Sequence, residues 1–214
     1  MTRRIENDSD ITEGLDHLAR VEPRFGPVIA LAGPVPLRRA QSGFEGLSRT
    51  IVSQQLSVAS ARAIWTRVTG RYPALCHDHI LEATEADLRG CGLSGPKIRT
   101  MRAVAQAAAE KRLDFLFLES ASPEDVHAMM TGVKGIGPWT ADIYLMFHLG
   151  HADVFAPGDL ALQEAVRIGF GLSARPVAKE LAAMAEAWTP WRAVAARLLW
   201  AYYNTAKIRE GIAV

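Results

Sequence analysis

The sequence of 214 residues has only two cysteines, Cys76 and Cys91, and no apolar run near the ~20 residues that a membrane-spanning helix requires. Two thiols cannot build a disulfide framework or hold a four-cysteine iron–sulfur cluster, so both classes of protein are excluded. The first ten residues carry two arginines but no apolar signal segment, so we expect a cytoplasmic protein that does not associate with membranes.

An excess of positive charge is also missing, since the formal net charge is only +1. Many DNA-binding proteins are strongly basic because each neutralised phosphate releases counterions. A nearly neutral chain can still bind DNA if its positive groups share one face. Composition therefore neither indicates nor excludes nucleic acid, and 49% hydrophobic with 22% charged residues is typical of a globular domain.

Alternating apolar patterns of the kind that predict strands are absent, and we find no internal repeat. Apolar residues recur instead with a period near 3.6, which predicts an all-α protein. Long helices are expected at about 44–53, 57–68, 96–111, 138–149, 159–169, 176–188 and 190–207. Further helices should begin near residues 10, 84 and 122, the first with a capping box of Asp10 and Glu13.

The most informative segment is the hairpin, residues 131–142, which reads Thr-Gly-Val-Lys-Gly-Ile-Gly-Pro-Trp-Thr-Ala-Asp. A helix ends, a glycine-rich turn follows, and Pro138 starts the next helix at once. Gly135 and Gly137 permit positive φ and leave the backbone bare, so N–H groups at the new helix start can face an anion. An ordinary helix–helix connection would need the same glycines, but the whole pattern favours a helix-hairpin-helix that binds the DNA backbone.

A carboxylate follows in the segment Ala156-Pro157-Gly158-Asp159, directly before an apolar helical run. A helix N-cap is the plain interpretation of Asp159, and it is compatible with a catalytic one. An N-cap carboxylate is held ionised by backbone N–H groups and the helix dipole. A fixed negative charge stabilises the oxocarbenium-like transition state of nucleoside cleavage, and it can also orient the attacking water.

Together, the hairpin and the Pro-Gly-Asp segment resemble the helix-hairpin-helix-GPD superfamily of DNA glycosylases, and within it the 3-methyladenine DNA glycosylase II family. Three further segments carry the resemblance, which covers roughly residues 44–200. They are Arg49-Thr50-Ile51-Val52-Ser53-Gln54-Gln55-Leu56-Ser57-Val58-Ala59, Cys91-Gly92-Leu93-Ser94-Gly95-Pro96-Lys97, and Trp188-Thr189-Pro190-Trp191-Arg192 with Leu199-Trp200.

The resemblance implies a monofunctional glycosylase that flips an alkylated purine out of double-stranded DNA and hydrolyses its glycosidic bond, with Asp159 as the catalytic residue. Gly135, Gly137 and Thr140 would bind phosphates, and Lys134 would face solvent or phosphate. No cofactor is implied as required. A sodium or potassium ion at the hairpin is a further implication, held by the carbonyl groups of Thr131, Val133 and Ile136.

Two tryptophans, Trp139 and Trp200, match aromatic positions of the base pocket, and indole faces attract cationic alkylated purines. Relatives that also cleave the strand place a Schiff-base lysine where Trp139 stands, and tryptophan cannot form an imine. Core packing is the alternative for both residues. We assign the other tryptophans, Trp65, Trp188 and Trp191, to packing and leave the pocket roles of Tyr144, Tyr202 and Tyr203 open.

The hole left by a flipped base is filled, in the family, from the loop that matches residues 53–57. Gln55 stands at the wedge position, where a relative has leucine, so either Gln55 or Leu56 is expected to fill the gap. Ser57 as a simple helix cap beside polar loop residues is the alternative interpretation.

From these matches we predict two helical lobes with a cleft between them. Residues 44–149 form the helix-hairpin-helix lobe, and residues 1–43 pack with residues 150–214, which carry the catalytic Asp159. We expect a monomer whose cleft receives DNA. Its duplex-facing positive groups should be Arg49, Arg62, Lys97, Arg99 and Lys134.

Three alternatives stay open at this point. A glycosylase/lyase of the same superfamily would need an imine-forming amine, and a non-enzymatic DNA-binding repair module would need only the hairpin. A metal site at Cys76-His77-Asp78-His79 fits no common zinc spacing, so a solvated turn is expected there. The sequence does not rank 3-methyladenine, 7-methylguanine, hypoxanthine and ethenoadenine as lesions.

Overall fold

The computed structural model describes residues 3–209, and within that range it contains helices, turns and loops but no strand. This confirms the all-α prediction, and an isolated bridge between Arg4 and His151 is the β-type contact of the same range. None of the described helices combines the length and apolar character needed to cross a membrane.

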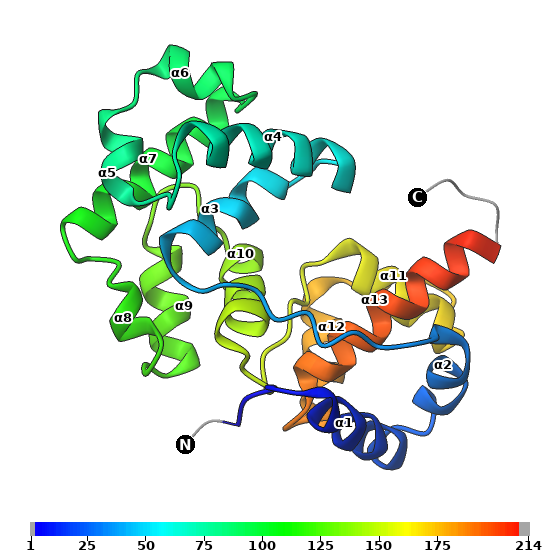
Figure 1. Cartoon of the computed structure of the whole chain (residues 1–214). Coiled ribbons are helices and arrows are strands. Elements are labelled where there is room, and N and C mark those ends of the chain that lie inside the picture. The colour runs from blue at the N-terminus through cyan, green and yellow to red at the C-terminus, as the bar shows by residue number, and fades with distance from the viewer. Residues whose placement is uncertain (1–2, 210–214) are drawn as a thin grey trace. The chain divides into compact units, whose positions relative to one another are not determined.

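The helices follow one another along the chain as Figure 1 shows. Their bounds are α1 Asp8–Val21, α2 Phe25–Ala32, α3 Gly43–Ser53, α4 Val58–Arg71, α5 His77–Glu82, α6 Glu85–Gly90, α7 Gly95–Ala109, α8 Phe115–Leu118, α9 Pro123–Thr131, α10 Pro138–Ile143, the π-helix η1 Tyr144–Leu149, α11 Leu160–Gly169, α12 Ala178–Ala185, the 3-10 helix η2 Glu186–Trp188 and α13 Arg192–Arg209.

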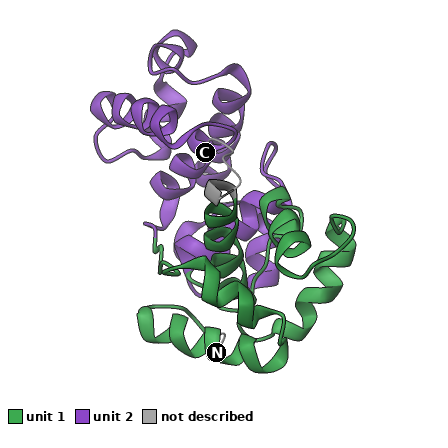
Figure 2. Ribbon diagram, turned by 90° about the vertical axis from the view of Figure 1, so that its right-hand side faces the viewer, with its two compact units in different colours: residues 1–39, 150–214 green, residues 40–149 purple. Residues whose placement is uncertain are grey.

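The chain divides into two compact units, coloured separately in Figure 2. Unit 1 combines residues 1–39 with 150–214, and unit 2 consists of residues 40–149. Unit 2 thus begins earlier than the residue 44 expected from the sequence. The reason is local: the Ala40 N–H donates to the Phe147 carbonyl at 2.9 Å, which ties residue 40 to η1.

In unit 1, α13 packs against α1, α2 and α11 around a cluster of aromatic rings. Trp188 is fully buried and meets Phe25 edge-on, with ring centroids 5.1 Å apart. Trp191 is also buried, so both tryptophans pack in the core as predicted. Gly14 lets α1 approach α13, since a Cβ there would lie 2.6 Å from a methyl group of Val194.

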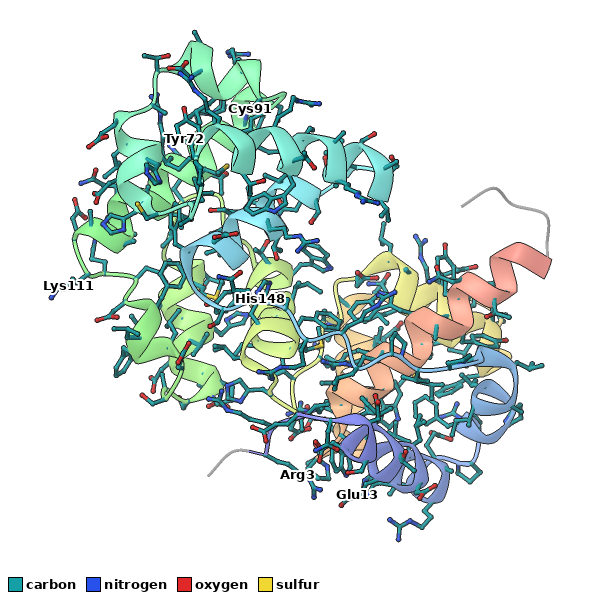
Figure 3. All side chains as sticks on the ribbon, viewed as in Figure 1. Arg3, Glu13, Tyr72, Cys91, Lys111 and His148 are labelled. Carbon is teal, nitrogen blue, oxygen red and sulfur yellow. The ribbon has the colours of Figure 1, made fainter. Side chains whose placement is uncertain are left out.

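In unit 2, α7 packs against α3, α5 and α6, and Tyr144 is buried at the start of η1. The Tyr144 ring stacks on His148, which Figure 3 labels, at 4.7 Å between centroids. Its hydroxyl oxygen accepts from the Gly43 N–H at 2.8 Å, and burial raises the pKa of Tyr144 to about 12. Tyr144 is therefore part of the core of unit 2.

Two local predictions about helix starts are wrong. α1 begins earlier than expected, because Asn7 is its N-cap and Asp10 closes the capping box as the N3 residue. The predicted solvated turn at 76–79 is instead the start of α5, with Cys76 as N-cap and the His79 Nδ1 accepting from the Cys76 N–H at 3.3 Å. Among the described residues, no three His, Cys, Asp or Glu side chains form a metal-binding group.

Candidate functional site

The hairpin joins α9 to α10 through a turn whose apolar residues are buried. Val133 and Ile136 are only 4% and 5% exposed, and the Ile136 N–H donates to the Val133 carbonyl at 3.0 Å. Gly135 has φ +94°, and a Cβ there would lie 2.3 Å from the Thr100 hydroxyl oxygen on α7. The turn is therefore fixed from inside, and position 135 requires glycine for both its conformation and its close approach to α7.

Gly137 is the N-cap of α10, and it differs from the expectation of positive φ. Its φ is −96° and its ψ 172°, an extended conformation that any residue can adopt. A Cβ at Gly137 would meet nothing within 4 Å. Within residues 3–209, the backbone N–H groups of Gly135 and Gly137 donate to no protein acceptor. Both are suited to an external anion at the start of a helix.

Thr140, expected to assist in phosphate binding, already has partners inside the protein. It is 3% exposed, and its N–H donates to the Gly137 carbonyl at 3.0 Å. Its hydroxyl oxygen accepts from the side-chain amide of Gln54 at 2.8 Å. Lys134, in contrast, is exposed on the turn, where both solvent and phosphate can reach it.

The wedge loop, residues 53–57, connects α3 to α4 and presents polar and apolar side chains to solvent. Gln55 is exposed and has φ +55°, an uncommon conformation for a residue with a side chain. Leu56 is 39% exposed, and Val58 just after the loop is 87% exposed. Ser57 caps α4 as predicted, since its hydroxyl accepts from the Ser60 N–H, and this cap leaves Gln55 and Leu56 available.

One of the five basic residues expected to face DNA has a structural partner. The Lys97 ammonium donates to the Val52 carbonyl at 2.6 Å, and partial burial lowers the pKa of Lys97. It therefore secures the end of α3 before the wedge loop. The side chains that are exposed as expected are Arg49, Arg62, Arg99 and Lys134.

Asp159 is the half-buried N-cap of α11 in unit 1. Its Oδ1 accepts from the N–H groups of Ala161 at 2.9 Å and Leu162 at 3.0 Å. The indole N–H of Trp200, on α13, donates to the same oxygen at 3.3 Å. Three donors on one oxygen fix the orientation of the carboxylate.

The two candidate pocket tryptophans lie in different units. Trp200 is half-buried beside Asp159 in unit 1, and its indole N–H contacts the carboxylate itself. Trp139 is the second residue of α10 in unit 2 and is also half-buried. No lysine stands at that position, so the side chain offers no amine for an imine.

A second carboxylate of note is Asp142, which is 8% exposed on α10. Burial raises the pKa of Asp142 to about 7. The nearest histidine is His127 on α9, with Nε2 3.7 Å from Oδ1, a distance that exceeds an ordinary hydrogen bond. Residue spacing does not reveal this pair, because the two residues belong to different helices of the hairpin.

Three further residues of these sites escaped sequence reasoning. Gln54 binds Thr140 across the fold, Val58 exposes an apolar side chain next to the wedge loop, and Leu160 is 62% exposed directly after Asp159. For Gln54, the available signal in the sequence was the pair of adjacent glutamines, Gln54 and Gln55. Nothing local distinguishes Val58 or Leu160 from apolar residues that face the core.

Comparisons with known proteins agree with these features. The family described as HhH-GPD superfamily base excision DNA repair protein matches residues 48–192. The DNA-3-methyladenine glycosylase 1 of Schizosaccharomyces pombe is 28% identical over 223 residues, which cover 98% of this chain and 96% of that protein. The alkylbase DNA glycosidase-like protein mag2 of the same yeast is 28% identical and covers 92% and 95%.

Solved structures give the same result. The S. pombe 3-methyladenine DNA glycosylase in complex with abasic DNA matches with a TM-score of 0.79 and 27% identity, covering 88% of this chain and 95% of that one. The DNA-3-methyladenine glycosidase of Bacillus halodurans also has a TM-score of 0.79, with 33% identity and coverage of 96% and 94%.

Proposed function

Because this chain belongs to the HhH-GPD superfamily of base excision DNA repair proteins, we propose that it is a monofunctional DNA glycosylase for alkylated purines. Its reaction is hydrolysis of the N-glycosidic bond in double-stranded DNA after the damaged base has been flipped out. Relatives that match nearly their whole length and are named 3-methyladenine glycosylases support this substrate class. We expect a cytoplasmic monomer.

The observation that carries the proposal is the carboxylate of Asp159 at the start of α11. The Ala161 and Leu162 N–H groups and the Trp200 indole all bind its Oδ1, so the negative charge is held in place before substrate arrives. As the base departs, positive charge develops on the deoxyribose, and a preoriented anion stabilises that charge without having to reorganise.

Water then completes the reaction. The carboxylate of Asp159 orients this water or accepts its proton, and the hydroxyl adds to the sugar carbon that the base has left. An N-alkylated purine is already cationic and leaves readily, so no general acid is needed. Trp139, in place of an imine-forming lysine, favours hydrolysis without strand cleavage.

DNA binding is assigned to unit 2. The N–H groups of Gly135 and Gly137 suit the phosphates of the lesion strand, because neither donates to an acceptor within residues 3–209 and Gly137 is the N-cap of α10. Lys134 adds a charge nearby. Gln55 or Leu56 enters the stack when the base leaves it, and the apolar Val58 beside them favours contact with bases.

A sodium or potassium ion under the hairpin is part of this proposal. The carbonyl groups of Thr131, Val133 and Ile136 would hold it, and neutral oxygen donors of this kind suit a hard monovalent cation. The Val133 carbonyl accepts one hydrogen bond, from the Ile136 N–H, and a second lone pair stays for a cation. Such an ion would stiffen the turn and would take no part in bond cleavage.

The decisive experiment is base release from methylated duplex DNA by the wild type and by Asp159→Asn. We expect free alkylated purine and intact abasic strands from the wild type, and binding without release from the variant. Borohydride should trap no covalent adduct, whereas an adduct would identify a glycosylase/lyase. A wild type that binds methylated DNA and releases no base would identify a DNA-binding module instead.

A further inference from the structure

The side chain of Gln54 joins two parts of unit 2 that have separate roles in the proposed function. Gln54 is the first residue after α3 and precedes the exposed Gln55 in the wedge loop. Its amide donates to the hydroxyl oxygen of Thr140 at 2.8 Å. Thr140 lies in the first turn of α10, where its N–H donates to the carbonyl of Gly137, the bare N-cap of the hairpin.

Two other bonds hold the ends of the wedge loop. Before the loop, the Lys97 ammonium donates to the Val52 carbonyl at 2.6 Å. After it, the Ser57 hydroxyl caps α4. Between these points, Gln54 provides the side-chain bond to the hairpin, and Gln55 and Leu56 project outward.

The conformation at Gln55 shows why such an anchor matters. A φ of +55° is unfavourable for a residue with a Cβ, so the surrounding structure must hold it. Strain of this kind persists where neighbouring bonds over-determine the backbone. The bond from Gln54 to Thr140 is immediately adjacent in sequence and is placed to supply that constraint.

We propose that Gln54 is a positioning residue that couples the wedge loop to the hairpin, so that the bound DNA backbone and the wedge keep one fixed register. The inference rests on the proposed function, in which the hairpin binds phosphates and the wedge loop enters the stack. Gln54 acts through Thr140 and Gln55 and need not touch the flipped base.

A double-mutant cycle tests this coupling. Gln54→Met removes the amide and keeps the length of the side chain, and Thr140→Val removes the hydroxyl and keeps the shape. Extrusion is followed by the fluorescence of 2-aminopurine placed beside a methylated base. We expect each single variant to reduce the extruded fraction about fivefold, the net worth of one neutral hydrogen bond. The double variant should show no larger loss, because both changes remove the same bond.

Affinity for undamaged duplex distinguishes the action of the wedge loop from the binding of DNA phosphates by the hairpin. Gln54→Met should leave this affinity nearly unchanged, because the Gln54 amide makes no bond to the N–H groups of Gly135 and Gly137 that would bind the backbone. Thr140→Ser keeps the hydroxyl and should retain wild-type extrusion. If Gln54→Met fails to fold, the difference in extrusion between Thr140→Ser and Thr140→Val still tests the bond. The matched control is Gln106→Met near the end of α7, which loses an exposed bond to Glu110 and should change nothing.

Additive losses in the cycle, wild-type extrusion in either single variant, or an equal loss of undamaged-duplex affinity would overturn the coupling. Because 2-aminopurine fluorescence reports extrusion and product analysis reports base release, a wild type that extrudes the base but releases none contradicts the proposed function alone. A wild type that neither extrudes nor releases contradicts both.

Discussion

α10 in unit 2 and α11 in unit 1 both start at a turn that contains glycine and proline, yet their first N–H groups differ in their hydrogen-bond partners. α10 begins at Gly137, which has no side chain to accept a hydrogen bond. α11 begins at Asp159, whose carboxylate accepts two of the helix's own N–H groups. The same unpaired backbone donors exist at every helix start.

The difference assigns opposite electrostatic tasks to the two helices. In the proposed function, the bare start of α10 would keep its positive potential for an anion that arrives from outside, such as a phosphate. The capped start of α11 holds the carboxylate of Asp159, which in the proposed reaction would stabilise the cation that forms on the sugar. Binding through backbone groups of this kind would let a chain of net charge +1 bind DNA.

The largest expected effect comes from removing the negative charge of Asp159, the N-cap of α11, while keeping a side chain that can cap the helix. Asp159→Asn retains a capping side chain but loses the negative charge, so base release should fall by about 10³-fold. Asp159→Ala should lose the same activity and in addition about 1 kcal/mol of unfolding free energy, because the cap is gone. Single-turnover base release and urea unfolding measure the two quantities. An active Asp159→Asn would contradict the catalytic role.

The reciprocal change installs a charge at α10. Gly137→Asp has space for its side chain, since nothing lies within 4 Å of a Cβ there. The new carboxylate should cap α10 and repel phosphate, which weakens duplex affinity about tenfold. Gly137→Asn is the matched control, because it caps without charge and should lose less affinity. Equal affinity of Gly137→Asp and wild type, measured by fluorescence anisotropy at fixed salt, would refute phosphate binding at this N–H.

The third donor to the Asp159 carboxylate can be removed with little change of shape. Trp200→Phe keeps an aromatic face but loses the indole N–H that donates at 3.3 Å. We expect kcat to fall about tenfold with KM nearly unchanged, since a hydrogen bond to a charged group is worth roughly 1.5 kcal/mol or more. If Trp200 served only to stack on the base, Trp200→Phe would instead raise KM and leave kcat close to the wild-type value.

Features set within three or four residues could be predicted from the sequence. Ser57, Ser122 and Asp159 cap their helices as expected, because a side-chain oxygen needs only the N–H groups two or three positions ahead.

Features that depend on distant residues could not be predicted. Gln54 and Thr140 are 86 positions apart, and Trp200 is 41 positions from Asp159, so no spacing rule relates them. The short helix α8 escaped notice because four residues are too few to show a 3.6-residue period. Around Asn7 several capping residues follow one another, and spacing alone does not rank them; the N-cap is Asn7, with Asp10 as the N3 residue.

Asp142 sharpens the contrast between the two helices, because it is a carboxylate of α10 whose charged form is disfavoured by burial. Its pKa is raised from 3.8 to about 7 by desolvation, whereas the carboxylate of α11 is surrounded by donors. Between the pKa of 3.8 that Asp142 has in the unfolded state and the pKa of about 7 that it has in the folded state, the folded state binds more protons than the unfolded state. The free energy of unfolding therefore falls as pH rises from about 4 to 7 and stays low above that window.

Asp142→Asn removes this titration, so the variant should be more stable than the wild type by about 1–3 kcal/mol at pH 8. At pH 5 the wild-type carboxyl is largely protonated in the folded state, and the difference should shrink. Urea unfolding at both pH values measures it, with the exposed Asp78→Asn as a control that gains nothing. A stability difference that is the same at pH 5 and pH 8 would show that Asp142 is ionised throughout, paired with His127 3.7 Å away.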